Sequence, residues 1–117
     1  MSYDVNFKVK VEGVDDYVEV CDCNANITSN VKEMLDKLTG INWKESKVGY
    51  CKDVMPLIES GYQKLKNNPN AYTKYNAANG WGTTDGVMTF LSKILIAWSD
   101  LQEYQPAYAK VAYFFIE

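Results

Sequence analysis

The chain has 117 residues, with 15 acidic side chains against 12 basic ones and a formal net charge of −3. Its hydrophobic share of 47% and aromatic share of 14% are typical of a globular protein and exclude a disordered one. This length suits a single domain, residues 1–117, built around one core.

The first elements form a predicted β-hairpin. Apolar and polar residues alternate from Tyr3 to Val11, which is typical of a strand with one buried and one wet face. A turn-rich stretch, residues 12–16, precedes a second β-rich run from Tyr17 to Cys21. We expect the polar residues 22–26 to form a connection.

A short helix is predicted next. Asn30 and Glu33 have the spacing of a capping box, and an apolar stripe with helical spacing follows them. Gly40 stands where a glycine ends a helix. Trp43 could pack in the core or line a pocket rim, and its large area favours the core. Residues 44–47 are charged, so we expect an exposed loop.

A second helix is expected from Asp53, the predicted N-cap, to the Asn67–Asn70 region. Pro56 is tolerated there because the first turn has N–H groups without helical partners. Gly61, in mid-helix, costs about 1 kcal/mol relative to alanine. We therefore expect another element to approach the helix closely at Gly61.

The third and longest helix follows a glycine-rich loop and carries the widest apolar stripe, which predicts a central position. Its expected core residues are Val87, Phe90, Leu91, Ile94, Trp98 and Leu101. Pro106 ends this helix. The last run, Ala107 to Ile116, is strand-like and apolar on both faces, so it is either interior to two layers or covered by a second subunit.

The predicted order β-β-α-α-α-β indicates an α+β domain with an antiparallel sheet of about three strands and helices packed on one face. Such a sheet leaves free edges, and its last strand has apolar residues on both faces. We expect a homodimer, or a higher homo-oligomer, assembled through that last strand.

The basic residues are all lysine, and histidine is absent. Without arginine the chain lacks the planar fork that recognises phosphate and guanine, so duplex nucleic acid is not an expected partner. Without histidine it lacks an imidazole base and a nitrogen ligand for metals. We therefore expect no catalysis, no metal site and no cofactor.

Three cysteines, Cys21, Cys23 and Cys51, give an odd number in a chain without a recognisable signal peptide, so a disulfide framework is not expected. The chain offers too few other potential ligands beside these cysteines to bind a metal, so we expect buried thiols. No apolar run reaches the roughly 18 residues that would span a bilayer. We expect no membrane association and a place in the cytoplasm.

The loop before the third helix is the predicted ligand site. Its glycines, Gly80 and Gly82, flank Trp81, whose ring could stack on a base. Backbone N–H groups and threonine hydroxyls at a helix start could bind an anion, although Asp85 already places a negative charge at the positive end of the helix dipole. A structural corner with Trp81 in the core is the alternative. The candidate ligand-binding residues are Tyr75, Asn79, Gly80, Trp81, Gly82, Thr83 and Thr84.

The chain resembles a group of small uncharacterised proteins encoded by bacteriophages and prophages. The resembling stretches are residues 3–5, residues 26–31 and above all residues 75–84, which contain Asn-Gly-Trp-Gly-Thr. The resemblance implies a phage accessory protein in the cytoplasm of a bacterial host cell, acting against host defence.

Two hypotheses follow from the loop and the last strand. In the first, the protein binds and sequesters a small nucleotide-like ligand through the glycine-rich loop. In the second, it inhibits a host defence protein through a tyrosine-rich surface or the apolar last strand.

Overall fold

The computed structural model describes residues 1–80 and 82–117. The elements are β1 (Ser2–Lys10), β2 (Tyr17–Thr28), η1 (Ser29–Val31), α1 (Lys32–Thr39), β3 (Lys47–Tyr50), α2 (Cys51–Asn67), η2 (Pro69–Tyr75), α3 (Thr84–Tyr104), α4 (Pro106–Ala109) and β4 (Tyr113–Ile116).

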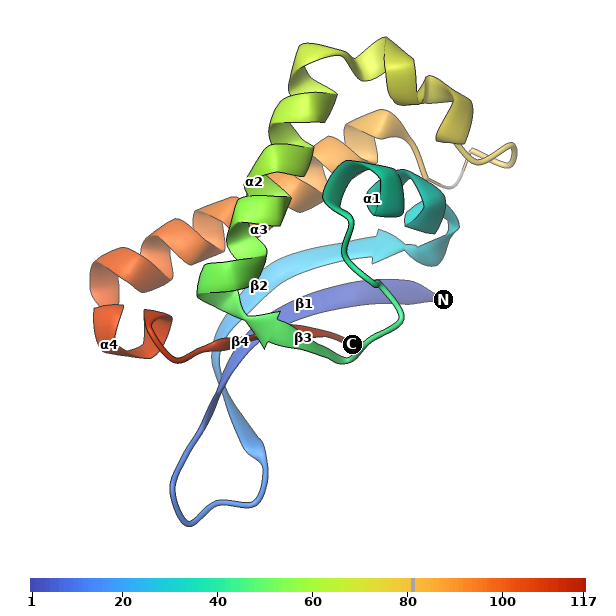
Figure 1. Ribbon diagram of the computed structural model, residues 1–117. Coiled ribbons are helices and arrows are strands. Elements are labelled where there is room, and N and C mark those ends of the chain that lie inside the picture. Colours follow the sequence, from blue (N-terminus) through green and yellow to red (C-terminus); the bar gives the residue numbers. More distant parts are fainter. Residues whose placement is uncertain (81) are drawn as a thin grey trace.

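The fold is α+β, as predicted. All strand pairs are antiparallel, and the strands lie in the order β2-β1-β4-β3. Helices α1, α2 and α3 cover one face of this sheet (Figure 1). The sheet has four strands where about three were predicted, and the additional strand, β3, begins at Lys47, the last residue of the segment expected to be a loop.

Strand β2 is longer than expected and includes residues 22–26, which were predicted to be a connection. From Cys23 to Ile27 its buried residues alternate with exposed polar ones. The polar residues resemble a loop in the sequence, but they form the outer face of an edge strand.

The predicted helix starts were wrong in detail. The Thr28 side chain caps the first turn by accepting a hydrogen bond from the Asn30 N–H at 3.3 Å, so Asn30 lies inside η1 instead of capping a helix. Helix α2 begins at Cys51, which places Asp53 in its first turn. Gly40, in contrast, ends α1 in the left-handed conformation, as predicted.

Trp43 lies in the core, as predicted, with 1% of its surface exposed. Its ring packs against Phe90 and Phe114, and its Nε1 donates to the Thr39 hydroxyl at 3.1 Å. The same hydroxyl donates to the Leu35 carbonyl. Thr39 is thus the polar centre around which the end of α1 and the Trp43 loop are fixed.

Gly61 marks the close approach of α1 and α2 that its position predicted. A Cβ at this position would lie 2.9 Å from Thr39 Cγ2 and 3.1 Å from the Leu38 carbonyl oxygen. Real Cβ atoms essentially never come as close to another atom as the Thr39 contact, and the backbone contact is tighter than most, so glycine allows the two helices to pack.

Strand β4 is internal, because β1 and β3 pair with its two edges. It therefore has no free edge for a second copy, contrary to the expected route of dimerisation. Phe114 and Ile116 are buried beneath the helices, whereas Tyr113 and Phe115 are half-buried on the opposite face of the sheet.

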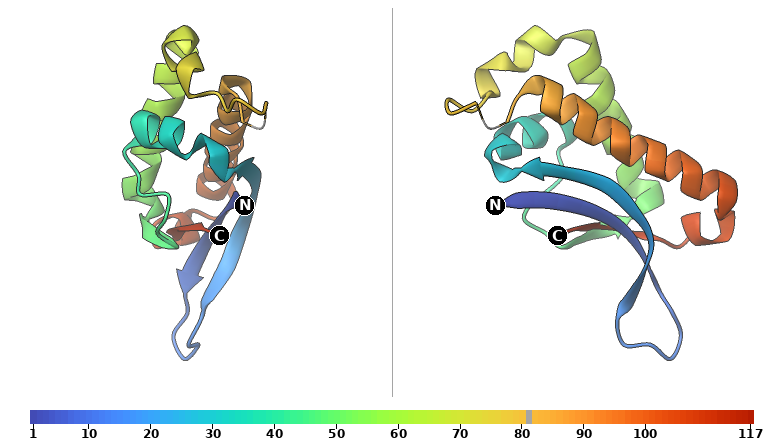
Figure 2. Two further views of the ribbon diagram at one scale, coloured as in Figure 1. Left: turned by 90° about the vertical axis from the view of Figure 1, so that its right-hand side faces the viewer. Right: turned by 180° about the vertical axis from the view of Figure 1, so that it is seen from behind.

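The molecule is elongated, with principal extents of 47 × 27 × 20 Å. Figure 2 shows that the β1–β2 hairpin twists away from the helices and projects beyond them. The other end of the molecule holds α1, η2 and the start of α3. The candidate loop therefore lies at the end opposite the hairpin tip.

Candidate functional site

The loop that precedes α3 is a closed turn. The Gly80 N–H donates to the Ala77 carbonyl, and the Ala77 N–H donates to the Gly82 carbonyl, each at 3.0 Å. Gly80 and Gly82 have φ of 79° and 115°, values that L side chains rarely adopt. The two glycines are therefore required by the backbone whatever the loop binds.

Gly82 also anchors the loop against the end of β2. A Cβ at this position would lie 2.5 Å from Val31 Cγ1 and 3.1 Å from Thr28 Cγ2. No such atom surrounds Gly80, where a Cβ would meet nothing within 4 Å. Gly82 thus has a packing role, and Gly80 lies open to solvent.

The first N–H groups of α3 are partly used by the protein itself. The Thr83 hydroxyl accepts from the Gly86 N–H at 3.2 Å, and the Asn76 side-chain oxygen accepts from the Thr84 N–H at 3.0 Å. Asp85 adds a negative charge in the same turn. This arrangement lessens the attraction of an anion to the helix start.

A groove of about 760 Å³ lies between the loop, the end of β2 and the first turns of α3. Its volume falls in the range that small-molecule sites occupy. The groove combines apolar lining residues, which form its floor, with polar ones at its rim. The lining residues are Met1, Ser2, Asn26, Ile27, Thr28, Gly80, Gly82, Thr83, Asp85, Gly86, Thr89, Phe90 and Lys93.

The structure brings three of the predicted site residues, Gly80, Gly82 and Thr83, to the groove. Asn79 and Thr84 are absent from its described lining. Trp81, the predicted stacking residue, lies outside the described residues.

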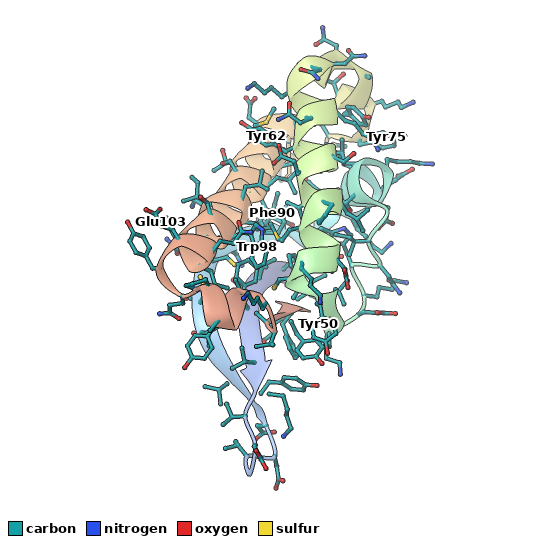
Figure 3. The ribbon with its side chains drawn as sticks, turned by 60° about the vertical axis from the view of Figure 1, so that its left-hand side comes forward. Tyr50, Tyr62, Tyr75, Phe90, Trp98 and Glu103 are labelled. Carbon is teal, nitrogen blue, oxygen red and sulfur yellow. The ribbon has the colours of Figure 1, made fainter. Side chains whose placement is uncertain are left out.

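Tyr75 is also absent from that lining. Its half-buried ring lies 6.4 Å from the ring of Tyr72, and the Lys74 ammonium lies over it at 5.2 Å. Figure 3 shows Tyr75 and Tyr62 on opposite sides of α2, both at the end of the molecule far from Tyr50. The position of Tyr75 favours a packing role beside α2.

Five polar groove residues were missed by sequence reasoning: Ser2, Asn26, Thr28, Thr89 and Lys93. Part of this set has a signal in the sequence. Asp85, Thr89 and Lys93 follow one another at intervals of four, which places them on one side of α3. Their meeting with β2 depends on tertiary packing alone.

No group of three or more potential metal ligands occurs in the part of the chain that the structure describes. Among the lining residues, Lys93 is the lysine and Asp85 is the carboxylate. The groove therefore offers hydroxyls, one ammonium and one carboxylate above an apolar floor. This set can bind a polar ligand.

Comparisons of the chain with protein-family models, with curated proteins and with solved structures found no match. Within residues 1–80 and 82–117, no helix is both long and apolar enough to cross a membrane.

Proposed function

We propose that the protein binds a small nucleotide-like ligand in the groove beside the glycine-rich loop and sequesters it without chemical change. The observation that supports this is the groove of about 760 Å³ at Gly80, Gly82 and Thr83, the loop selected from the sequence. A groove of this size can accommodate a ligand of a few hundred daltons.

The chemistry of the lining suits the parts of a nucleotide. Ile27 and buried Phe90 provide an apolar floor for a planar base. The hydroxyls of Thr28 and Thr89 and the carboxylate of Asp85 can bond ribose hydroxyls or an exocyclic amine.

The phosphate is assigned to Lys93, which lies two turns into α3. The Thr84 and Gly86 N–H groups already have partners, and Asp85 would repel an anion at the first turn. A lysine ammonium binds phosphate as a point charge and needs no arginine fork.

The test is isothermal titration calorimetry with cyclic dinucleotides and ADP-ribose derivatives. If one of them binds the wild-type protein, Lys93→Ala should weaken its affinity by about tenfold, which corresponds to about 1.4 kcal/mol. Thr89→Leu should abolish binding by filling the groove. Lys37→Ala, on exposed α1 surface outside the groove lining, is the matched control and should bind as the wild type does.

Absence of binding by every probe would count against this proposal, as would equal losses in Lys93→Ala and Lys37→Ala. Recovery of a chemically altered ligand after incubation would contradict sequestration. The predicted stacking of Trp81 is tested separately, because binding should quench tryptophan fluorescence in the wild type and not in Trp81→Phe.

The proposed setting is a bacterial host cell infected by a phage, where removal of a nucleotide signal would weaken host defence. This setting rests on the resemblance of residues 75–84 to phage-encoded proteins. It predicts that expression of the protein restores infection by a phage that a nucleotide-signalling defence otherwise blocks, and that Thr89→Leu does not.

A second candidate, inhibition of a host protein, is favoured by the open face of the sheet. Four rings gather there and form the aromatic sheet face, namely Tyr17, Tyr50, Tyr113 and Phe115. Lys47 lies over the rings of Tyr17 and Tyr113 at 5.1 and 5.2 Å. Aromatic side chains, tyrosine above all, are enriched at protein interfaces.

For this candidate, Tyr50→Ser should abolish binding to an identified host protein in a reconstituted, purified pair. Thr89→Leu should leave that binding unchanged. The reverse pattern would assign the interaction to the groove, and equal binding by both variants would exclude the aromatic sheet face.

A further inference from the structure

Strand β2 carries a bulge at Cys23 and Asn24, next to its other cysteine, Cys21. The pairing passes from Val5–Ala25 to Asn6–Asp22, so Cys23 and Asn24 have no partner residue on β1. Asn24 has φ of 50°, and its N–H donates to the Asp22 carboxylate at 2.8 Å. Asn24 is therefore held by a local turn instead of the sheet ladder, close to the ladder residue Cys21, which pairs with Phe7.

The bulge brings two thiols together. Cys21 is half-buried and Cys23 is buried, and the two side chains are close enough for each to affect the pKa of the other. Cys51, at the start of α2, is the third free thiol and is also buried. The sequence analysis expected only buried thiols, and the structure adds the contact between Cys21 and Cys23.

Cys21 and Cys23 both line a hollow of about 280 Å³ between β2 and α3. A small oxidant in this hollow would meet Cys21, the more exposed of the two residues. Cys51 does not line the hollow. The lining residues are Cys21, Asp22, Cys23, Asn24, Lys93, Ile96, Ala97 and Asp100.

The surroundings of the three thiols shift their pKa values in different directions. The hydrogen bond from Cys23 lowers the pKa of Cys21, although burial and the charges of Asp22, Asp100 and Glu19 oppose that effect. The same hydrogen bond and burial raise the pKa of Cys23. Burial raises the pKa of Cys51 to about 12. Cys21 is therefore the nucleophilic thiol, since the thiolate is the reactive form.

We propose that Cys21 and Cys23 form a redox-active dithiol that closes to a disulfide when a peroxide enters the hollow beside α3. The Cys21 thiolate attacks one peroxide oxygen, which forms an S–O bond, breaks the O–O bond and releases an alcohol or water. Cys23 then attacks the sulfur of the Cys21 sulfenic acid, and its proton leaves with the hydroxyl as water. The dithiol loses two electrons and two protons, and the peroxide is reduced.

The test uses the reduced full-length chain and hydrogen peroxide, followed by tryptic digestion without reductant and mass spectrometry. Residues 11–32 form one tryptic peptide that contains both Cys21 and Cys23, whereas Cys51 lies in residues 48–52. The expected product is peptide 11–32 lighter by two hydrogen masses. A cross-linked pair of peptides joined through Cys51 would overturn the proposal.

Variants separate the two steps. Cys23→Ser should leave a sulfenic acid on Cys21 that dimedone traps, and Cys21→Ser should give neither that adduct nor a disulfide. Cys51→Ser is the matched control and should close the disulfide as the wild type does. Dimedone labelling of Cys51 before Cys21, or an unchanged peptide 11–32 in oxidised wild-type protein, would overturn the proposal.

A second measurement guards against variants that fail to fold. Iodoacetamide should alkylate Cys21 of the native wild-type protein about tenfold or more faster than Cys51, because Cys21 is more accessible and more readily ionised. Equal rates for the two thiols would overturn the assignment of Cys21 as the nucleophile.

Discussion

At the scale of single residues, the hydroxyl of Thr39 has more partners than its position in the sequence suggests. It accepts hydrogen bonds from the Ile41 N–H at 3.2 Å and from Trp43 Nε1 at 3.1 Å, and it donates to the Leu35 carbonyl at 2.8 Å. Thr39 is only 5% exposed. Water therefore cannot replace a lost partner, and each orphaned group has its full desolvation cost.

Thr39→Val should lower the free energy of unfolding by about 1–3 kcal/mol, because the two donors lose their acceptor while the shape is kept. The free energy of unfolding is measured by urea denaturation, with tryptophan fluorescence as the signal. Thr39→Ser retains the hydroxyl and should recover part of the loss. Thr73→Val, at an exposed site, should change stability by no more than about 0.5 kcal/mol.

Tyr113 gives a prediction at alkaline pH. A hydrogen bond with Tyr50, followed by desolvation, raises the pKa of Tyr113 from 10.0 to about 12. The folded protein thus holds the phenolic proton more tightly than the unfolded chain does. The resulting stabilisation is complete below pH 10 and is lost as the pH rises through about 12.

Absorbance titration at alkaline pH should therefore detect a tyrosine that ionises late in the native protein. Tyr113→Phe should remove that late step, and Tyr50→Phe should shift it toward the ordinary pKa by removing the hydrogen bond. A late step that is unchanged in Tyr113→Phe would assign it to another tyrosine.

At the scale of elements, the two glycines within helices have opposite surroundings. Gly61 faces the Leu38 carbonyl and Thr39 on α1, whereas a Cβ on Gly86 would meet nothing closer than Thr83 Oγ1 at 3.6 Å. Alanine favours a helix over glycine by about 1 kcal/mol at either position. The difference between the two sites is therefore one of packing.

Gly61→Ala should destabilise the protein by about 1–3 kcal/mol, since overpacking outweighs the gain in helix propensity. Gly86→Ala should be neutral or stabilising by up to about 1 kcal/mol. Thermal and urea unfolding measure both. Stabilisation by Gly61→Ala would show that α1 and α2 can move apart without loss.

The elements show how far the sequence predicts this fold. Periodicity identified β1 and the long helix α3, and the cost of a glycine in mid-helix identified the close approach at Gly61. Periodicity missed the second half of β2 because the polar residues Asp22, Asn24 and Asn26 form its exposed face. It also missed β3, because a strand of four residues has too few residues for a period to be recognised.

Only the local part of the candidate site could be predicted from the sequence. The unusual φ values of Gly80 and Gly82 follow from local turn chemistry. The groove itself requires Thr28 of β2 to lie beside α3, and the thiol pair requires a bulge. The groove depends on a long-range contact, and the bulge is an irregularity in the pairing of β2 with β1, so neither has a local pattern in the sequence.

At the scale of the whole molecule, the backbone amides should be unevenly protected against hydrogen exchange. Strands β1 and β4 lie in the middle of the sheet, with Phe7 and Phe114 fully buried, while the hairpin turn projects from the helices (Figure 2). Val11 and Val14 at that turn are exposed. Local opening should therefore begin at the turn and end in the central strands.

Hydrogen exchange followed by mass spectrometry should find the fastest exchange in residues 11–16 and the slowest in β1 residues 5–9 and in β4. Segments of α2 and α3 that face the sheet should exchange at intermediate rates. Rapid exchange in β4 would contradict its central position.

The central position of β4 also has a consequence for synthesis on the ribosome. Val5 pairs with Ile116, so strands from opposite ends of the printed sequence are neighbours, and β1 and β3 are joined only through β4. A nascent chain that has not yet exposed β4 holds a β-hairpin and a lone strand with an unfilled gap between them. Folding of the sheet must then wait for translation to pass residue 116, and until that moment both unpaired edges are open to chaperones or to aggregation.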